Sequence, residues 1–343
     1  MAGKEFRWGL CGCGGFVTTK VIPLLKEIEG ARIVKAYDPL PATREKVKSA
    51  FGLTTVDSYD AVLDDASIEC VYIASPNYLH APQTIAAAEK GKHVFCQKPM
   101  ARTADEARPM VDACRKAGVQ LGVGFCYRFA GGPEKMKELM REGAIGKPTL
   151  VTVEFHLGYT KDSSSTAVAW RCDPKLSGGG PLMDLAPHLV DMARFLMDDE
   201  FTSVFSHVDP MKTDTDVEED TISLLRFSKG ARAVIDCTFN ARNHGHRIIV
   251  NGAKGRLETI RSMCWGPGGI LFRSDQAERE MIPIGMHEHI KKEMVLFMDA
   301  VRQGKDVPVS GRDGLITNIV IDAIYKSGAT GKPVKLDYVQ QLF

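Results

Sequence analysis

The chain has 343 residues, of which 44% are apolar and 25% charged, and its formal net charge at neutral pH is +1. This length exceeds one ordinary hydrophobic core and predicts two domains, and the small net charge favours neither a nucleic acid nor a membrane surface as a partner. We see no signal peptide and no segment long enough to span a bilayer. Nine cysteines without a Cys-x-x-Cys pair fit reduced thiols in a cytoplasmic protein.

The first predicted strand, Phe6 to Leu10, enters a glycine-rich turn that is followed by a helical apolar pattern. This order is the context of a dinucleotide-binding fingerprint, in which glycines allow a tight turn and a close approach of the backbone to a pyrophosphate at the helix N-terminus. The third glycine position holds Val17, so the match is imperfect. We expect the cofactor loop to comprise Gly12, Gly14, Gly15 and Phe16.

A second predicted strand, Arg32 to Tyr37, ends at Asp38. A carboxylate at this position accepts hydrogen bonds from the adenosine ribose hydroxyls and repels a 2′-phosphate, so Asp38 favours NAD over NADP. The spacing from Gly12 is somewhat longer than the usual ~20 residues. The alternative is a simple turn, since Asp-Pro is a common turn starter.

Strands and helices continue to alternate up to a predicted boundary at Arg128. The remaining strands are expected at Cys70–Ala74, from His93, and at Val119–Phe125, with helices at 42–51, 59–64, 81–90 and 103–117. Strands that alternate with helices predict a doubly wound parallel sheet with right-handed crossovers. Residues 1–128 are therefore expected to form the first domain, and residues 129–343 the second.

The strand that begins at His93 runs into Gln97, Lys98 and Pro99. Proline cannot continue the ladder, so the strand should end there. Lys98 would then follow the carboxyl end of a parallel strand, where open α/β sheets bind ligands. A lysine held near a dry cofactor can act as an acid or base. The alternative is a lysine on a loop that reaches into water.

In the second half of the chain, predicted strands follow one another and no longer alternate with helices. Helices are expected at 133–141, 182–197, 289–303 and 314–327, and a first strand at Thr149–Leu157. Seven further strands are expected at 201–208, 221–227, 232–239, 247–251, 256–259, 270–273 and 280–284. Because turns join consecutive strands, a largely antiparallel sheet is predicted.

Asp184, His188 and Asp191 are spaced to share one face of the helix expected at 182–197. An acid beside a histidine can fix its tautomer and raise its basicity, which suits a general base for an alcohol. Pro187 should disturb this helix, and the alternative is a solvent-facing helix N-terminus. No metal site is expected, because His244, His246, His287 and His289 lack partners at ligand spacing.

Several motifs recur together along the whole chain and carry a resemblance. They are Gly12-Cys13-Gly14, Ser75 to His80, Gln97-Lys98-Pro99, Tyr127-Arg128-Phe129, Gly178-Gly179-Gly180 before Asp184, His188 and Asp191, Ile249 to Gly255, and Gly311 to Gly314. In this order they resemble the glucose–fructose oxidoreductase/inositol dehydrogenase family, often called Gfo/Idh/MocA. The commoner family motif has glutamate where this chain has Gln97.

The resemblance implies an α/β fold, with an N-terminal Rossmann domain and a C-terminal α/β domain built on a large open sheet. It implies bound NAD(P) and a substrate between the domains, with Lys98 beside the nicotinamide, His188 as general base and Asp184 as its orienting acid. The residues implied to line the cofactor are Ser75, Asn77, His80, Gln97 and Arg128. Those expected to bind substrate, besides Lys98, Asp184 and His188, are Tyr127, Tyr159, Trp170 and Arg171, and Asn240 could also read its hydroxyl pattern.

The expected activity is reversible hydride transfer between nicotinamide and a secondary alcohol of a sugar, sugar derivative or cyclitol. Two alternatives remain open: a redox-assisted glycosidase that regenerates its own NAD, and a non-catalytic sugar or cofactor sensor on the same scaffold. By resemblance, the open sheet would build a homodimer or homotetramer.

Overall fold

The computed structural model describes residues 5–158, 170–209, 216–260, 268–274, 280–285 and 288–338. The chain divides into two compact units, one of residues 1–124 and 290–315, the other of residues 125–289 and 316–343. This division falls close to the predicted boundary at Arg128, and a carboxyl-terminal segment joins the first unit. None of the helices in the described ranges combines the length and apolar character needed to cross a bilayer.

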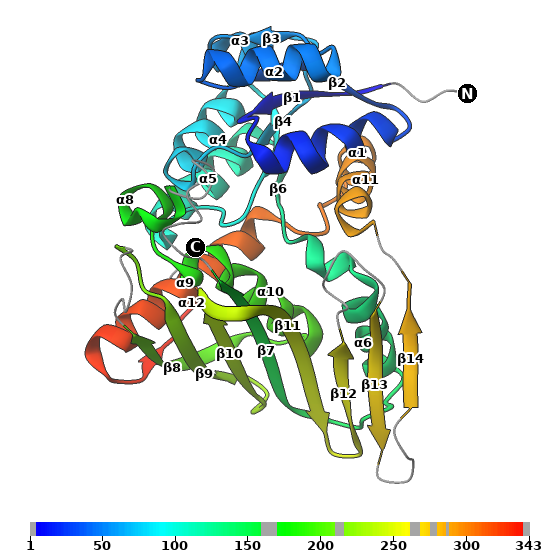
Figure 1. The fold of residues 1–343 in the computed structure, drawn as a ribbon, viewed down its shortest axis with the longest axis vertical. Coiled ribbons are helices and arrows are strands. Elements are labelled where there is room, and N and C mark those ends of the chain that lie inside the picture. The colour runs from blue at the N-terminus through cyan, green and yellow to red at the C-terminus, as the bar shows by residue number, and fades with distance from the viewer. Residues whose placement is uncertain are drawn as a thin grey trace. The chain divides into compact units, whose positions relative to one another are not determined.

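The first unit contains a parallel sheet in the order β3-β2-β1-β4-β5-β6 (Figure 1). Its strands are β1 (Phe6–Cys11), β2 (Ala31–Tyr37), β3 (Thr55–Val56), β4 (Cys70–Ile73), β5 (His93–Cys96) and β6 (Leu121–Val123). The order reverses between β1 and β4, the position at which such sheets bind ligands beyond their carboxyl ends. The predicted Rossmann-type domain is confirmed.

The helices of this unit follow the strands as the apolar pattern predicted. They are the π-helical turn η1 (Val17–Val21), α1 (Ile22–Glu27), α2 (Pro41–Phe51), α3 (Asp60–Leu63), the 3-10 turn η2 (Asn77–Leu79), α4 (His80–Glu89), α5 (Ala104–Ala117) and α11 (His289–Arg302), whose first residue lies at the boundary of the units. The N-terminus of α5 is capped by the Thr103 side chain, which accepts a hydrogen bond from the backbone N–H of Glu106.

A cluster of aromatic rings forms the core beside this sheet. Trp8, Tyr72 and Phe95 come from adjacent strands, and the ring of Phe297 on α11 packs edge-on against Phe95 with centroids 5.1 Å apart. All of these strand side chains are at most 1% exposed. Edge-to-face contacts of this kind add to the free energy gained by burying the rings, and they explain why residues 290–315 belong to the first unit.

The second unit is built on a sheet in the order β14-β13-β12-β11-β7-β10-β9-β8-β15. Its strands are β7 (Pro148–Gly158), β8 (Phe201–Asp209), β9 (Asp220–Phe227), β10 (Arg232–Thr238), β11 (Asn240–Gly252), β12 (Gly255–Ile260), β13 (Gly268–Ser274), β14 (Glu280–Ile284) and β15 (Val334–Lys335). Only β7 and β10 pair in parallel among the described strand pairs of this sheet, so the prediction of a mostly antiparallel sheet is confirmed.

Helices pack on one face of this sheet. The helical segments are η3 (Cys126–Phe129), α6 (Gly131–Arg141), η4 (Trp170–Cys172), α8 (Pro174–Ser177), α9 (Pro181–Asp184), α10 (Ala186–Met197) and α12 (Gly311–Thr330), which starts in the first unit. α10 packs on β7 and β10 (Figure 1). The opposite face is open, because residues alternate along β9: Leu225 and Phe227 are buried, whereas Ile222 and Leu224 are 47% and 54% exposed.

The single helix predicted over 182–197 is wrong. The structure has two helices, α9 and α10, which are separated at Leu185. Pro187 is the physical reason, since it has no backbone N–H and is tolerated only in the first turn of a helix, where it stands in α10. Asp184 therefore ends one helix, while His188 and Asp191 lie on the next.

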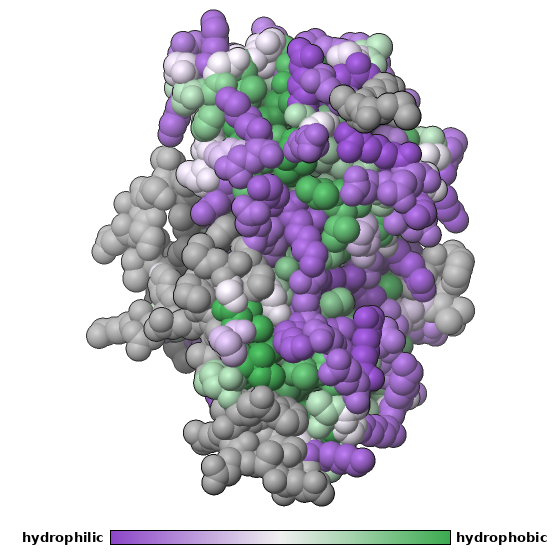
Figure 2. Space-filling model, turned by 90° about the vertical axis from the view of Figure 1, so that its right-hand side faces the viewer, coloured by the Kyte–Doolittle hydropathy of each residue, from purple (hydrophilic) through white to green (hydrophobic). Residues whose placement is uncertain are grey.

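The surface of the described residues is largely hydrophilic in the view of Figure 2, with small apolar patches between polar side chains. Such a distribution is ordinary for a protein surface, where isolated apolar residues need no special explanation.

Candidate active site

The glycine turn after β1 is shaped by a close backbone approach. Gly12 has φ +87°, and a Cβ atom at this position would lie 2.7 Å from the backbone of Ala74 and Ser75, which follow β4. A side chain there would clash as well as strain the backbone. By contrast, Cβ atoms at Gly14 and Gly15 would meet no atom of the described residues within 4 Å, apart from their own chain neighbours. The described residues thus leave room there for a pyrophosphate, which the fingerprint predicts.

Asp38 is held beside this turn. Its Oδ2 accepts a hydrogen bond from the backbone N–H of Cys13 at 2.9 Å, and its Oδ1 accepts one from the N–H of Leu40 at 3.0 Å. Each carboxylate oxygen has a second lone pair. The Asp38 carboxylate can therefore still accept hydrogen bonds from two ribose hydroxyls, although the residue is only 8% exposed.

The segment after β4 is tied to the segment after β5 by His80. The His80 ring is 1% exposed, and its two nitrogens lie 2.8 Å from the carbonyl oxygen of Ser75 and 2.9 Å from that of Pro99. Burial lowers the pKa of His80. Ser75 donates its hydroxyl proton to Gln83, and Asn77 is 4% exposed. A neutral imidazole carries one N–H, so His80 can donate a hydrogen bond to only one of these two carbonyl oxygens at a time while it packs against both loops.

Gln97 and Lys98 follow β5. The Gln97 amide donates a hydrogen bond to the buried hydroxyl of Tyr72, and its side chain covers Gly124, where a Cβ atom would come within 3.0 Å of the amide. Lys98 is half-buried. The adjacent strands β2, β1, β4 and β5 therefore deliver Asp38, the glycine turn, Ser75 and Lys98 to one edge of the sheet.

In the second unit, Asp184 is joined to two residues that were expected to bind substrate. Its Oδ1 lies 3.6 Å from Nε of Arg171, and the Arg171 guanidinium stacks 4.8 Å from the centre of the Trp170 ring. A planar guanidinium can bind a carboxylate and stack on an aromatic ring at once. Arg171 thus contacts Asp184 directly, and Trp170 holds the Arg171 guanidinium from its other side.

His188 lies in the first turn of α10 and is 8% exposed. Its ring packs on that of Tyr127, with centroids 4.5 Å apart, and meets Phe125 edge-on at 6.2 Å. The structure therefore brings together Tyr127 and His188, two of the expected substrate-site residues.

Arg128 is bound by Asp191. Nε of Arg128 donates to Oδ2 of Asp191 at 2.8 Å, and its Nη2 donates to Oδ1. The two side chains are 12% and 2% exposed, and a bidentate pair of this kind fixes both partners in orientation. The family resemblance had placed Arg128 at the cofactor, and its pairing with Asp191 was not foreseen, because no sequence pattern relates the two residues.

Two further histidines lie near Tyr127. From the sequence they were considered only as possible metal ligands. The rings of His289 and His246 lie 5.6 Å and 6.3 Å from that of Tyr127. Burial lowers the pKa of His246 to about 4, so this imidazole is neutral at neutral pH. Within the described ranges, no group of three or more histidine, cysteine, aspartate or glutamate side chains is arranged to hold a metal ion.

Four residues that the sequence singled out need separate mention. Tyr159 and His287 lie outside the described residues, as does the side chain of His244. Asn240 is in the described part of β11, where its amide lies 3.3 Å from Oδ2 of Asp220.

Comparisons with known proteins identify the family of the chain. Residues 6–125 match a family model described as an oxidoreductase family with an NAD-binding Rossmann fold, and residues 134–258 match the GFO/IDH/MocA C-terminal domain. D-xylose 1-dehydrogenase (NADP(+)) 2 of Haloferax volcanii is 31% identical over 96% of this chain and 99% of its own. The 1,5-anhydro-D-fructose reductase of Ensifer adhaerens is 28% identical over 96% and 98%.

Solved structures are similar over nearly the whole chain. A levoglucosan dehydrogenase in complex with NADH and levoglucosan superposes with a TM-score of 0.87 and 27% identity, covering 97% of this chain and 100% of that chain.

Proposed function

Because the chain belongs to the GFO/IDH/MocA family of oxidoreductases, we propose that it is an NAD-dependent dehydrogenase of a sugar, anhydrosugar or cyclitol. The family and the related dehydrogenases identify an oxidoreductase that acts on a CH–OH group. The observation that carries the proposal is the edge of the first sheet, where four adjacent strands deliver the open glycine turn, Asp38, Ser75 and Lys98.

Each site residue has its own part in the proposed reaction. The bound nicotinamide supplies a carbon that accepts or returns hydride. Lys98 donates a hydrogen bond to the oxygen of the reacting hydroxyl, and His188 accepts the hydroxyl proton. Asp184 holds a neighbouring hydroxyl or the base. Packing of His188 on Tyr127 orients the imidazole, which general base catalysis requires.

We propose NAD rather than NADP as the cofactor. The Asp38 carboxylate would lie next to a 2′-phosphate and repel it. Arg44 of α2 donates its Nη1 to the carbonyl oxygens of Asp38 and Pro39 at 2.8 and 3.1 Å, so this nitrogen binds the protein's own backbone. Because the Haloferax volcanii relative is named as an NADP(+) enzyme, the affinities of this chain for NAD and NADP should be measured side by side.

We also propose that the open sheet face of the second unit pairs with a second copy of the chain. On this face Arg232 of β10 stands directly opposite Arg226 of β9, and farther along β10 Asp236 stands opposite Glu154 of β7. Like charges placed opposite each other destabilise a sheet. Exposed Leu224, with Val234 beside it, lies between the arginine pair, which forms the positive end of this patch, and the pair of Asp236 with Glu154, which forms its negative end.

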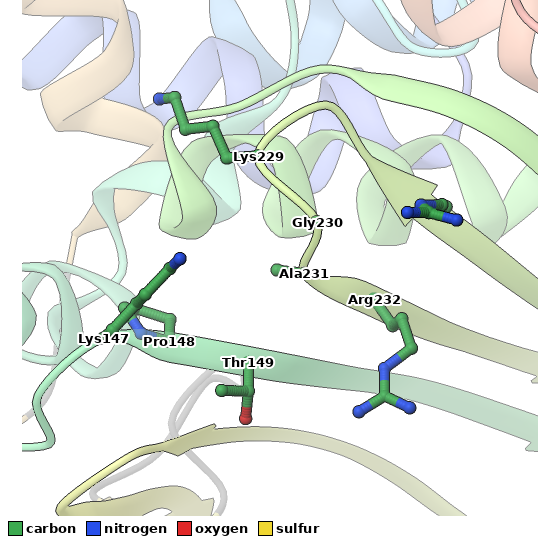
Figure 3. Close-up of a pocket in the computed structure, with 8 residues that line it drawn as sticks. Lys147, Pro148, Thr149, Lys229, Gly230, Ala231 and Arg232 are labelled. Atoms are coloured by element: carbon green, nitrogen blue, oxygen red, sulfur yellow. The ribbon is translucent and has the colours of Figure 1, made fainter.

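A two-fold axis would place each positive end over a negative end of the partner copy. Lys147 and Lys229 add positive charge near the arginine pair and line, with Arg226 and Arg232, a pocket of about 540 Å³ (Figure 3). Such an isologous contact would use the same patch on both copies and would close as a dimer, or as one interface of a tetramer.

A cytoplasmic location is proposed from the described cysteines, all of which are free.

A substrate screen tests the proposed activity. The purified protein is mixed with NAD⁺ or NADP⁺ and with inositols, aldoses, sugar acids, anhydrosugars or glycosides, while reduced nicotinamide and released aglycone are followed. Net NADH from one polyol, lost in Lys98→Ala and His188→Ala variants that still bind NAD, is the expected result. Aglycone release without net NADH would instead show a redox-assisted glycosidase. Cofactor binding without any turnover, with biological activity unchanged in both variants, would identify a sensor.

A further inference from the structure

One half-buried carboxylate, that of Glu218, binds the start of the helix that ends at Asp184. Oε1 of Glu218 accepts hydrogen bonds from the backbone N–H groups of Gly180, at 2.9 Å, and Leu182, at 3.1 Å. These groups lie at the beginning of α9, where no carbonyl within the helix can accept their protons. Glu218 therefore supplies the missing acceptor from a segment distant in sequence.

The same oxygen is held in place by α12. The hydroxyl of Tyr325 donates to Oε1 of Glu218 at 2.8 Å. Burial raises the pKa of Glu218, and the bonds from Gly180, Tyr325 and Leu182 oppose that effect. Three donors thus converge on one atom, and a carboxylate oxygen bonded in this way has little freedom to rotate.

Gly179 and Gly180 are fitted closely to Tyr325 and to the backbone of Glu218. A Cβ atom at Gly180 would lie 2.1 Å from the backbone carbonyl oxygen of Glu218, and one at Gly179 would lie 1.9 Å from the hydroxyl of Tyr325. Even an alanine side chain would displace the turn or its partners. These two glycines are thus explained by the close approach of Glu218 and Tyr325.

A short chain of hydrogen bonds connects Glu218 to Asp184. The N–H of Gly180 donates to Glu218, while the carbonyl oxygen of Gly180 accepts from the N–H of Asp184 at 3.0 Å. α9 ends at Asp184 and has no further turn of its own to define its direction. The position of Asp184 is therefore set through Gly180, which Glu218 binds.

We propose that Glu218 is a positioning residue of the dehydrogenase: it fixes α9, and through Gly180 it places the Asp184 carboxylate for work on the substrate hydroxyl. Glu218 itself touches no substrate. This role rests on the proposed function, because it gives Asp184 a part in catalysis.

The first test compares Glu218→Ala with Glu218→Gln. Alanine removes the acceptor, and we expect kcat to fall by about 10- to 100-fold, as displacement of a reacting group by about 1 Å can cost, with little change in NAD affinity. Glutamine retains an oxygen acceptor and should restore most of kcat. Equal activity of the alanine variant and the wild type would overturn the proposal, as would a loss of kcat that glutamine does not reverse.

A second test asks whether Glu218 acts through Asp184. In a double-mutant cycle, Glu218→Ala should lower kcat much less in an Asp184→Asn background than in the wild type, because the group that it positions is already disabled. Independent, multiplicative losses would refute the proposed link. Tyr325→Phe, which removes one hydrogen bond and keeps the ring, provides a milder variant if Glu218→Ala does not fold.

Ser327→Ala serves as the matched control. Ser327 also lies on α12, is fully buried, and bonds the N–H of Ser206 and the carbonyl oxygen of Lys332. This variant should lose stability comparably to Tyr325→Phe and keep the kcat of the wild type. A fall in kcat that matches that of Tyr325→Phe would mean that both act only through stability, against the proposal.

Amide hydrogen exchange separates this inference from the proposed function. Exchange at Gly180 and Leu182 should be much faster in Glu218→Ala than in Glu218→Gln, whether or not a substrate is known. Fast exchange in Glu218→Ala, together with cofactor binding, no turnover and unchanged biological activity in Lys98→Ala and His188→Ala, would support the contact of Glu218 with α9 and reject the dehydrogenase. Unchanged exchange would reject the positioning role even in an active enzyme.

Discussion

Replacing Asp191 with asparagine removes the charge that binds Arg128 and keeps the size of the side chain. The pair is bidentate, and its side chains are 12% and 2% exposed, so water can do little to solvate a guanidinium left alone. Breaking a buried pair by removing one partner costs about 3–5 kcal/mol. Because asparagine keeps one oxygen acceptor, we expect a loss of about 3 kcal/mol, at the lower end of this range.

The pair of Arg115 with Asp112 provides the exposed control. Nη2 of Arg115 donates to Oδ1 of Asp112 at 2.9 Å, and the two side chains are 75% and 55% exposed, so water solvates either partner left alone. Asp112→Asn should therefore cost no more than about 1 kcal/mol, as for pairs that water screens.

Urea denaturation of the two variants, followed by circular dichroism and by tryptophan fluorescence, measures these differences. Coincidence of the two probes must be checked first, because a chain of two units can depart from two-state unfolding. A double variant, Arg128→Met with Asp191→Leu, should recover most of the stability lost in Asp191→Asn. Equal losses in Asp191→Asn and Asp112→Asn would refute the argument from burial.

Three further predictions concern the cofactor loop, acid stability and self-association. Gly12→Ala should lower the melting temperature of the cofactor-free protein, because its Cβ would lie 2.7 Å from the Ala74 backbone at φ +87°, whereas Gly14→Ala should leave that temperature unchanged and only weaken NAD binding in calorimetry. The pKa of His246 is lowered to about 4, so its contribution to stability is present above its ordinary pKa near 6.5 and is lost as the pH falls. Between pH 7 and pH 5 this loss amounts to about 2 kcal/mol for a folded-state pKa of about 4. Urea denaturation at both pH values should show that loss in the wild type, and its persistence in His246→Gln would contradict the assignment. Leu224→Asp on the open face should shift sedimentation toward the monomer, whereas Leu40→Asp, at a residue 62% exposed in the first unit, should not.

Local patterns were sufficient for the strands and helices of residues 1–124. The strands β4, β5 and β6 are buried along nearly their whole length and the helices carry an apolar stripe, so the strand period of two and the helix period of 3.6 could be told apart along the chain. The glycine turn, Asp38 and Lys98 each follow a strand directly. In a parallel sheet, residues that follow successive strands reach the same edge whatever the details of packing.

Long-range contacts were beyond such patterns. The break at Leu185 could be suspected from Pro187, but where each helix ends depended on α9 being bound by Glu218. The pairing of Arg128 with Asp191 likewise joins residues that no periodicity relates.

The sequence alone thus determined the fold class, the family and the residues at the edge of the first sheet, because these depend on interactions between near neighbours in the chain. Only the tertiary structure decided which side chains support Asp184 and His188. That support comes from Glu218, Arg171 and Tyr127, which reach their positions when the second sheet and its helices pack. A hydrogen bond or ring contact between distant segments cannot be predicted from the local pattern of residues in the sequence.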